Sequence, residues 1–209
     1  MTKNVSSEPR SAGRPRSFDA HAALRAAMRR FRMHGYAATS MKDLETATGL
    51  GAGSLYNSFG TKHEIFLAAL RHYNENVVRA RINSHLKGAA PVEELRALFR
   101  SVLDEPSGER FGCLLTNTAV EIAGTSKPIS TRVNEGFGLL AQAFEAQSER
   151  ARGLGQIAAS RRTHRKTALR LLHAYQGLLV LVRFGHARSE LAELIDDTID
   201  DIFRGDPDV

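Results

Sequence analysis

The sequence predicts an all-α protein, and three observations support this prediction. The 209 residues are 42% hydrophobic and 25% charged, with Ala, Leu, Arg and Glu prominent beside few β-branched residues. Apolar residues recur at intervals of three and four along most of the chain, which is the period of a helix with one apolar face. Glycines and prolines fall mainly between these periodic segments, where they end or begin helices.

Several classes of protein are excluded or disfavoured by what the sequence lacks. A single Cys cannot form an intrachain disulfide, and no apolar run is long enough for a transmembrane helix or a signal peptide. The eight His are scattered, and no His-Glu-x-x-His, phosphate-binding glycine loop or Gly-x-Ser-x-Gly motif occurs. We therefore expect a cytoplasmic protein without a membrane partner, catalytic residues, metal or cofactor.

The chain begins with a basic arm and a long helix. Residues 1–16 are rich in Ser, Pro and Arg, which favours a flexible arm. Its Arg14 and Arg16 can enter a narrow minor groove of DNA or make only non-specific phosphate contacts, and the sequence leaves both interpretations open. Residues 18–34 are predicted to form the first helix, because apolar residues form a broad stripe there and four arginines occupy the rest of its surface.

Residues 39–62 read as two short helices joined by a glycine turn. Thr39 or Ser40 is a suitable N-cap for the first helix, and Gly49 can end it in a left-handed conformation. Its apolar face is predicted to contain Met41, Leu44, Ala47 and Leu50. The second helix covers about residues 52–59 and is nearly free of charge. Two short helices with a tight turn predict a helix-turn-helix, whose second helix can enter the major groove.

The distribution of charge supports this interpretation. Residues 1–62 contain ten Lys and Arg but four Asp and Glu, so they account for the whole net charge of +6. A solvated basic surface would be the default explanation of a charged run by itself. Because the excess coincides with the helix-turn-helix, we expect double-stranded DNA to be the partner.

Further helices are predicted along the rest of the chain. Thr61 followed by Glu64 is a capping box for a helix over residues 61–86, and Pro91 suits the first turn of a helix over residues 91–103. Periodic apolar residues predict two more helices, over residues 111–121 and 129–152.

The last two helices are predicted over residues 165–184 and from Ser189, which is a suitable cap, towards the C-terminus. Residues 165–184 are hydrophobic nearly all round, so a core can cover one side and a second copy of the chain the other. The residues expected at this dimer interface are Leu169, Leu172, Leu179, Val180, Leu191, Leu194, Ile195 and Ile202.

Apolar and isolated polar residues on these helices are candidates for an effector pocket. Cys113 has two readings, an inert buried thiol or a reactive sensor thiol whose pKa a helix N-terminus would lower. For each of the pocket residues, membership of the core is the competing interpretation. The candidates are Phe99, Leu103, Phe111, Cys113, Asn117, Phe144, His173, Tyr175 and Gln176.

The first part of the chain resembles the DNA-binding domain of the tetracycline-repressor (TetR) family of bacterial transcriptional regulators. The match runs from Gly13 to Leu70, and the remainder matches in helix order only. Gly112-Cys113-Leu114-Leu115 is also similar to the start of a helix in one branch of the family. The residues that carry the resemblance are Phe31, His34, Gly35, Tyr36, Thr39, Ser40, Leu44, Ala47, Thr48, Gly49, Leu50, Gly53, Ser54, Leu55, Tyr56, Phe59 and Lys62.

The resemblance implies an Ω-shaped, all-α homodimer of about nine helices, with a three-helix head and a larger effector-binding and dimerisation domain. It also implies roles for individual residues. Thr39, Ser40, Tyr56 and Lys62 would contact phosphates, and Ala52, Gly53 and Ser54 would face base edges. Asn57 stands where many relatives carry His, and it can bond adenine or hold a phosphate. Tyr56 can alternatively be a packing aromatic, whereas Leu55 and Phe59 are assigned to the core.

The predicted organisation is a basic arm at 1–16, a helix-turn-helix domain at 17–62, and a ligand-binding and dimerisation domain at 63–209. The predicted function is a ligand-responsive repressor that binds a palindromic operator as a dimer, associates with the nucleoid, and is released by a small-molecule effector. The alternatives are an effector-independent or architectural DNA-binding protein, and a regulator that senses oxidants or electrophiles through Cys113. The sequence does not distinguish repression from activation.

Overall fold

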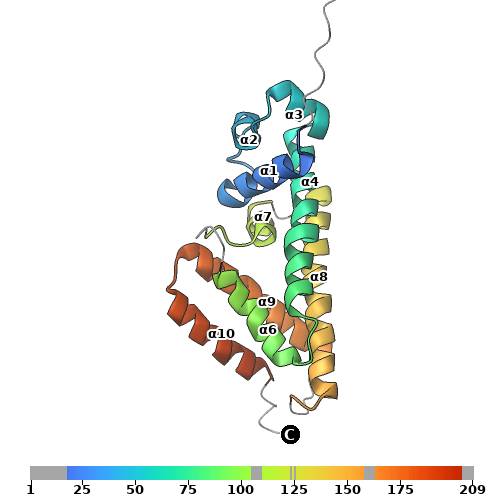
Figure 1. Ribbon diagram of the computed structural model, residues 1–209, viewed down its shortest axis with the longest axis vertical. Helices are drawn as coiled ribbons and strands as arrows, with labels where there is room; N and C mark the ends of the chain where they lie inside the picture. Colours follow the sequence, from blue (N-terminus) through green and yellow to red (C-terminus); the bar gives the residue numbers. More distant parts are fainter. Residues whose placement is uncertain (1–17, 105–109, 123, 125, 158–162, 204–209) are drawn as a thin grey trace, which may run out of the picture.

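The structure is a computed structural model that describes residues 18–104, 110–122, 124, 126–157 and 163–203. Its described residues form α-helices and contain no β-strand, which confirms the predicted fold class. The molecule is elongated, with a small head formed by α1 (Ala20–His34), α2 (Met41–Thr48) and α3 (Ala52–Phe59) at the top of Figure 1. Arg14 and Arg16, which are candidate DNA contacts, lie outside the described residues.

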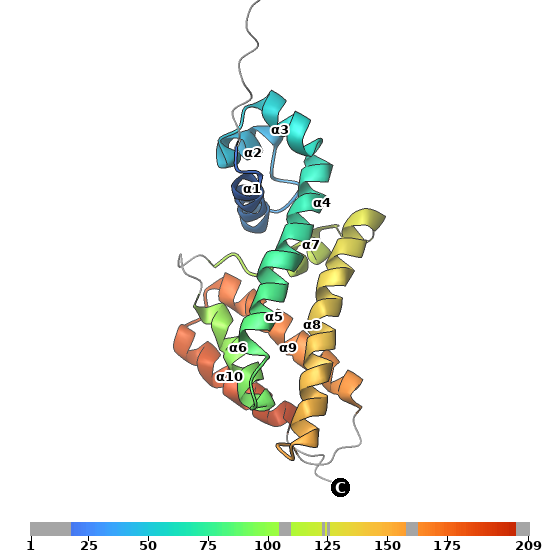
Figure 2. The same ribbon diagram turned by 45° about the vertical axis from the view of Figure 1, so that its right-hand side comes forward.

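A long rod connects the head to the body. It begins as α4 (Lys62–Tyr73), widens into a π-helical turn, η1 (Asn74–Val78), and continues as α5 (Arg79–His85). The rod runs beside α8 (Lys127–Gly153), as two views of the molecule show (Figures 1 and 2). The sequence predicted one uninterrupted helix here, because no Gly or Pro marks the π turn.

The body contains α6 (Pro91–Arg100), a 3₁₀ turn η2 (Ser101–Leu103), α7 (Leu114–Ile122), α9 (His164–Phe184) and α10 (Arg188–Phe203). In Figure 2, α6, α9 and α10 form the lower part, and α7 lies between them and the head. With α4, η1 and α5 counted as one rod, the described helices agree with the predicted number of about nine.

Local signals fix several helix ends as predicted. Ser40 and Asp43 form a capping box at α2, and Gly49 ends α2 with a left-handed φ of 70°. Thr61 and Glu64 form a second capping box at α4. The predicted cap Ser189 is wrong, because α10 already begins at Arg188. Ala47 is exposed, so its predicted place on the apolar face of α2 is also wrong.

Two groups of aromatic residues mark the core. In the head, Phe31 and Phe66 meet edge to face with ring centroids 4.7 Å apart, and Leu55 is fully buried. Phe59 is half-buried and packs against this core, as assigned. In the body, Tyr175 lies edge to face against Phe99 with centroids 5.1 Å apart. Each large side chain buried in this way stabilises the fold by about 1.5–3 kcal/mol. The head and the body therefore each have their own hydrophobic core.

Candidate nucleic-acid interface

Helix α3 presents a polar, uncharged surface to solvent. All its residues except Leu55, which is buried, and Phe59, which is half-buried, are exposed, and Tyr56 keeps 60% of its surface accessible. Gly53 has no neighbouring atom within 4 Å of the position that a Cβ would occupy. Small residues at the N-terminal end of a helix allow its backbone to approach another surface closely. The exposed side chains of Ser54 and Asn57 can donate or accept hydrogen bonds there.

The start of α2 is held by charged and polar contacts. The Ser40 hydroxyl donates to the Asp43 carboxylate over 2.7 Å, and Arg30 of α1 lies 3.0 Å from the same carboxylate. The hydrogen bond from the Ser40 main-chain amide is the largest of the effects that lower the pKa of Asp43, and it is followed by the hydroxyl contact. Asp43 therefore remains ionised and fixes the cap of α2 at the exposed face.

The side chain of Thr39 does not face solvent, where the resemblance implied that it would contact a phosphate. The residue is fully buried, and its hydroxyl donates to the main-chain oxygen of Gly35 over 2.7 Å. Because the hydroxyl is already engaged, it shapes the turn between α1 and α2 and is not available to a phosphate. Ser40 is the exposed member of the pair.

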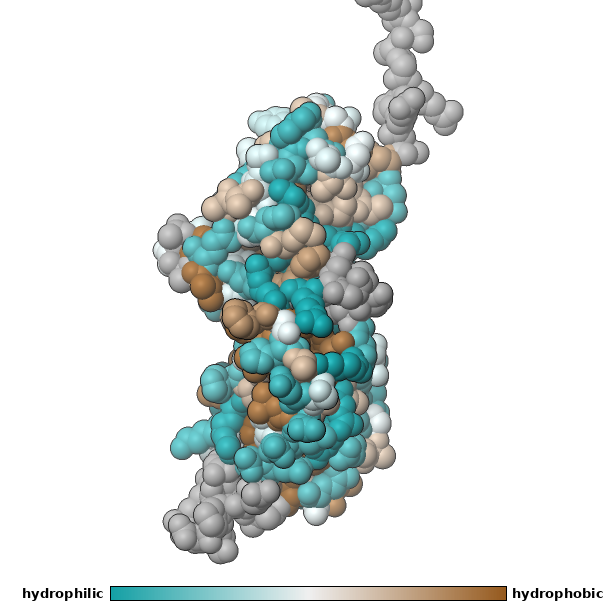
Figure 3. Space-filling model, turned by 90° about the vertical axis from the view of Figure 1, so that its left-hand side faces the viewer, coloured by the Kyte–Doolittle hydropathy of each residue, from teal (hydrophilic) through white to brown (hydrophobic). Residues whose placement is uncertain are grey.

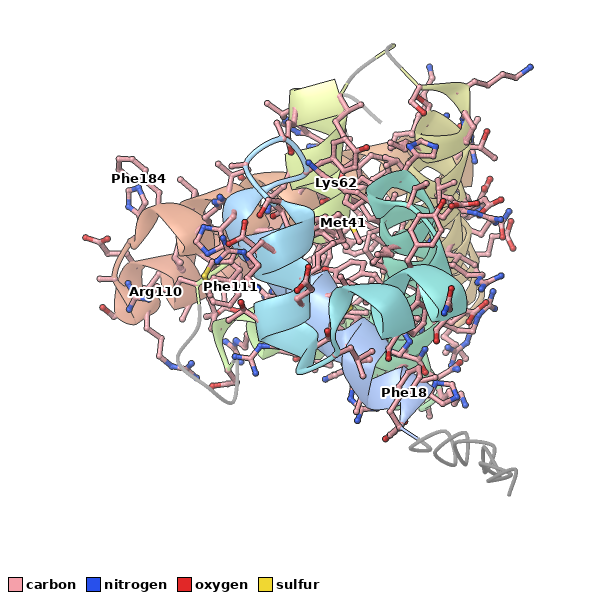
Figure 4. The ribbon with its side chains drawn as sticks, turned by 90° about the horizontal axis from the view of Figure 1, so that it is seen from above. Phe18, Met41, Lys62, Arg110, Phe111 and Phe184 are labelled. Atoms are coloured by element: carbon pink, nitrogen blue, oxygen red, sulfur yellow. The ribbon has the colours of Figure 1, made fainter. Side chains whose placement is uncertain are left out.

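Lys62 is positioned by the same turn. Its ammonium nitrogen lies 4.4 Å from the centroid of the Tyr36 ring and donates to the main-chain oxygen of Ala37 over 3.4 Å. Figure 4 views the head from above, with Lys62 near the turn between α1 and α2. A half-buried lysine held in this way keeps its charge close to the N-terminus of α4 and can attract a phosphate.

The body is joined to the end of α1 and the following turn by hydrogen bonds that the sequence did not predict. The Glu121 carboxylate on α7 accepts hydrogen bonds from the main-chain amides of Tyr36 and Ala37, at 2.8 and 2.6 Å. The Arg32 Nε donates to the main-chain oxygen of Gly112 over 2.6 Å. Asn117, which was predicted to line a pocket, instead donates to the main-chain oxygens of Arg32 and Phe111.

These contacts fix the orientation of the head on the body. They join residues that lie about 80 positions apart in the chain, and Arg183 of α9 adds a donor to the Phe111 oxygen at 3.1 Å. In Figure 4, Arg110 and Phe111 lie beneath this junction, towards the same side as Phe184. Movement of α7 or α9 can therefore reach the turn that positions Lys62.

The predicted pocket residues do not surround one cavity. Cys113 and Tyr175 line a small enclosed cavity of about 10 Å³ together with Tyr73, Arg81 and four apolar residues. Phe99 and His173 border a separate groove of about 400 Å³ between α9 and α10. Phe144 is fully buried among the body aromatics, and Gln176 accepts a hydrogen bond from Thr116. Leu103 and Phe111 are half-buried. The common effector pocket stays a prediction.

Cys113 is a buried thiol. It keeps 3% of its surface accessible and lies next to Tyr73, whose pKa is raised well above its usual value first by burial and then by the neighbouring cysteine. Arg110, three residues before it in the chain, donates to the main-chain oxygen of Gly185 at the end of α9. This burial favours the inert interpretation of the thiol, because a reactive cysteine needs access to its reagent.

The predicted dimer residues divide into two groups. Leu169, Val180 and Leu194 are exposed, at 49%, 52% and 44%, whereas Leu172 is half-buried. Phe184, which was not predicted, is 84% exposed and points away from the body in Figure 4. Apolar residues appear as brown patches on the body in Figure 3. The remaining members are buried within the protomer and belong to its own core: Leu179, Leu191, Ile195 and Ile202.

Within the described part of the chain, no group of three or more His, Cys, Asp or Glu side chains is placed to hold a metal ion. None of the helices described there is sufficiently long and apolar to cross a membrane.

A three-helix head with an exposed, polar second helix, mounted on a larger helical body, defines a protein of the helix-turn-helix class. The model of the family described as "Bacterial regulatory proteins, tetR family" matches residues 23–69. The model described as "Tetracyclin repressor-like, C-terminal domain" matches residues 91–196, just over half of the chain. The chain belongs to the TetR family of bacterial regulatory proteins, and the predicted membership is confirmed.

Two curated relatives share parts of this chain. The HTH-type transcriptional repressor ComR of Escherichia coli (strain K12) is 50% identical over 64 residues, which are 31% of this chain and 30% of ComR. An uncharacterized HTH-type transcriptional regulator, YezE of Bacillus subtilis (strain 168), is 33% identical over 113 residues, 52% of this chain and 57% of YezE. The alignments thus span less than two thirds of either relative.

A solved structure is similar over most of the fold. It is a cysteine mutant of the TetR family transcriptional regulator CifR, complexed with 26-base-pair double-strand operator DNA. The two chains are 25% identical with a TM-score of 0.79, and the similarity covers 90% of this chain and 98% of that one.

Proposed function

We propose that this protein is a transcriptional repressor that binds double-stranded operator DNA through α2 and α3. The observation that carries the proposal is the exposed, uncharged face of α3 within residues 1–62, the segment that accounts for the net positive charge of the chain. Positive charge supplies affinity for phosphates, and Ser54 and Asn57 supply hydrogen-bonding groups for base edges. The operator complex of CifR and the repressor name of ComR support the same function.

The proposed organisation follows from this role. We propose that residues 17–62 include the DNA-binding domain and residues 63–209 the regulatory and dimerisation domain, whereas the predicted basic arm at 1–16 lies outside the described residues. The exposed residues Leu169, Val180, Phe184 and Leu194 on α9 and α10 support a dimer, because a surface of this kind is stabilised when a second copy covers it. A dimer would contact two half-sites of a palindromic operator in the cytoplasm, on the nucleoid.

A small-molecule effector would release the DNA by favouring another arrangement of head and body. Such a ligand acts only through its different affinities for the two arrangements, typically about 1–3 kcal/mol of coupling. The rod from α4 to α5 and the contacts of Glu121 and Arg32 are the physical links between the two parts. A compound that saturates the protein without changing its operator affinity would not be an effector in this sense.

Genomic DNA from the source organism tests the regulatory role. Purified protein is incubated with sheared genomic fragments, and the bound fragments are sequenced. We expect enrichment of fragments that contain an inverted repeat upstream of a gene, including one beside the gene for this protein. Uniform recovery of fragments in proportion to their length would instead indicate an architectural DNA-binding protein.

Sedimentation tests the dimer. Val180→Glu places a charge on the exposed apolar face and should shift the protein towards a monomer. Leu154→Glu alters a residue that is 59% exposed at the far end of α8 and should leave the mass in solution unchanged. If both variants sediment with the same mass, the exposed face that contains Val180 is not the dimer interface.

A further inference from the structure

A polar groove runs between the rod and the N-terminal half of α8. Its volume is about 670 Å³, which lies within the range of about 300–1,000 Å³ typical of small-molecule sites. One wall comes from the end of α4, η1 and the start of α5, and the other from α8. The charged and amide side chains that line it include Arg71, Glu75, Arg79, Arg132, Asn134 and Gln142.

Two arginines of the first wall have their guanidinium groups unengaged. Arg71 lies four residues before Glu75, and Arg79 lies four residues after it. Neither arginine forms an ion pair or a side-chain hydrogen bond within the described residues. Arg96 elsewhere in the body contrasts with them, because it contacts both Asp196 and Asp200. An unengaged guanidinium keeps its planar set of donors, which matches the two oxygens of a carboxylate or phosphate.

The second wall adds neutral donors rather than competing charge. Arg132 is already paired with Glu135 through two contacts of 3.1 and 2.9 Å, so these two charges offset each other. The amides of Asn134 and Gln142 are exposed on the same wall. Two free positive charges face one free carboxylate, that of Glu75, so the groove favours a negatively charged occupant.

Asn74 defines the base of the groove. It is 5% exposed, and its Nδ2 donates to the main-chain oxygen of Arg132 over 2.9 Å, which ties the π turn to α8. Its Oδ1 is buried and has no hydrogen-bond partner among the described residues. The Oδ1 faces Gly136 of α8 and the Leu115 side chain, so Asn74 packs the rod against α8 and leaves binding of an occupant to the arginines.

We propose that this groove binds a small oxyanion, such as a carboxylate or a phosphate ester. Arg71 and Arg79 hold the anionic group, and Glu75 limits its affinity. The site is separate from the DNA-binding surface and from the enclosed cavity at Cys113. The proposal therefore stands independently of the proposed function.

Anion binding at the groove must be distinguished from non-specific attraction to the basic head. Citrate and glycerol phosphate, which represent the two chemical sources, are titrated by calorimetry at constant ionic strength, and hydrogen exchange locates the protected segments. The doubly substituted variant R71Q/R79Q removes both guanidinium groups. Arg165→Gln is the matched control, because Arg165 is exposed and lies 3.7 Å from Glu145 outside the groove.

We expect at least one of the two probes to protect residues 71–79 and 131–142 of the wild type. The R71Q/R79Q variant should weaken that probe's binding by about tenfold or more, because it removes charge-assisted hydrogen bonds that contribute to the binding free energy. Arg165→Gln should leave the affinity unchanged. Glu75→Gln should strengthen binding, an effect that a merely structural role would not produce. Protection confined to residues 20–62, or equal affinity in the wild type and R71Q/R79Q, would overturn the proposal.

Discussion

The carboxylate of Glu121 and the main-chain amide of Ala37 are joined by a hydrogen bond of 2.6 Å, and the amide of Tyr36 donates to the same carboxylate over 2.8 Å. This contact connects α7 of the body to the turn between α1 and α2. Ala37 in turn accepts a hydrogen bond from Lys62 through its main-chain oxygen. Glu121 of the body is therefore linked through Ala37 to Lys62, which is a candidate phosphate-binding residue.

Glu121→Ala should loosen this turn. Two main-chain amides lose a charged acceptor at an exposed site, so the free energy of unfolding should fall by about 1 kcal/mol. Amide exchange at Tyr36 and Ala37 should become faster than in the wild type. Glu149→Ala, on the exposed surface of α8, is the control, and unchanged protection of the two amides in Glu121→Ala would contradict the structural role.

Lys62→Ala and Ser54→Ala should affect DNA binding in different ways. Lys62 is expected to contact a phosphate, so its loss should weaken binding to all duplexes and reduce the salt dependence by about one released ion. Ser54 and Asn57 are expected to face bases, so Ser54→Ala or Asn57→Ala should change the preference among operator variants. Fluorescence anisotropy over a series of salt concentrations separates the two patterns. Identical effects of all three substitutions on every duplex would contradict these roles.

Gly136→Ala should destabilise the body, and Gly138→Ala two residues later should not. A Cβ at Gly136 would lie 2.3 Å from the Asn74 Oδ1 and 2.4 Å from the Leu115 Cδ1, whereas a Cβ at Gly138 meets no atom within 4 Å. Overpacking of this kind costs about 1–3 kcal/mol, while replacing an unconstrained helical glycine by alanine gains about 0.5–1 kcal/mol. Urea unfolding of the two variants should shift in opposite directions. A stable Gly136→Ala variant would show that the rod and α8 are not closely packed.

His72 should make stability depend on pH in the range where histidines titrate. Burial, followed by the nearby His21 and Arg25 of α1, lowers the pKa of His72 below its usual value of 6.5, and Glu75 acts in the opposite direction. The unfolded chain therefore binds a proton more readily, so the free energy of unfolding should decrease as the pH falls through 6.5.

His72→Gln provides the comparison for that pH dependence. It should reduce the difference in stability between about pH 7.5 and pH 5.5, because glutamine does not titrate. The exposed His173→Gln should retain most of the difference. Acids such as Asp43 do not interfere, since the pKa of Asp43 is lowered from 3.8 and the residue titrates below this range. An unchanged slope in His72→Gln would refute the assignment.

The head was predictable from sequence because its signals are local. The capping pairs Ser40 with Asp43 and Thr61 with Glu64 each span three residues, and Gly49 requires its own backbone conformation, so all three are visible without tertiary information. The buried state of Thr39 was not visible, because a threonine before a helix can equally well face solvent. Its hydroxyl turns inward because the Gly35 oxygen is available in the folded turn.

The contacts between head and body could not be predicted for a physical reason. Glu121 and Ala37 are 84 residues apart, and Arg32 and Gly112 are 80 apart, so only the assembled fold brings them together. The same limit applies to the dimer residues. Periodicity placed Ile195 and Val180 in one apolar set, but only packing decides that Ile195 is 1% exposed and Val180 is 52% exposed. For Asn117, sequence reasoning proposed a pocket, and the structure uses its amide as a link to α1.

Selection of DNA from a random pool tests the central proposal most directly. Purified protein is mixed with random duplexes at physiological salt, and the bound molecules are amplified and sequenced over several rounds. We predict the enrichment of an inverted repeat whose half-sites lie about one helical turn apart, and its loss when Ser54 and Asn57 are both replaced by Ala. A pool that remains without any enriched sequence would contradict the account of α3 as a sequence-reading helix.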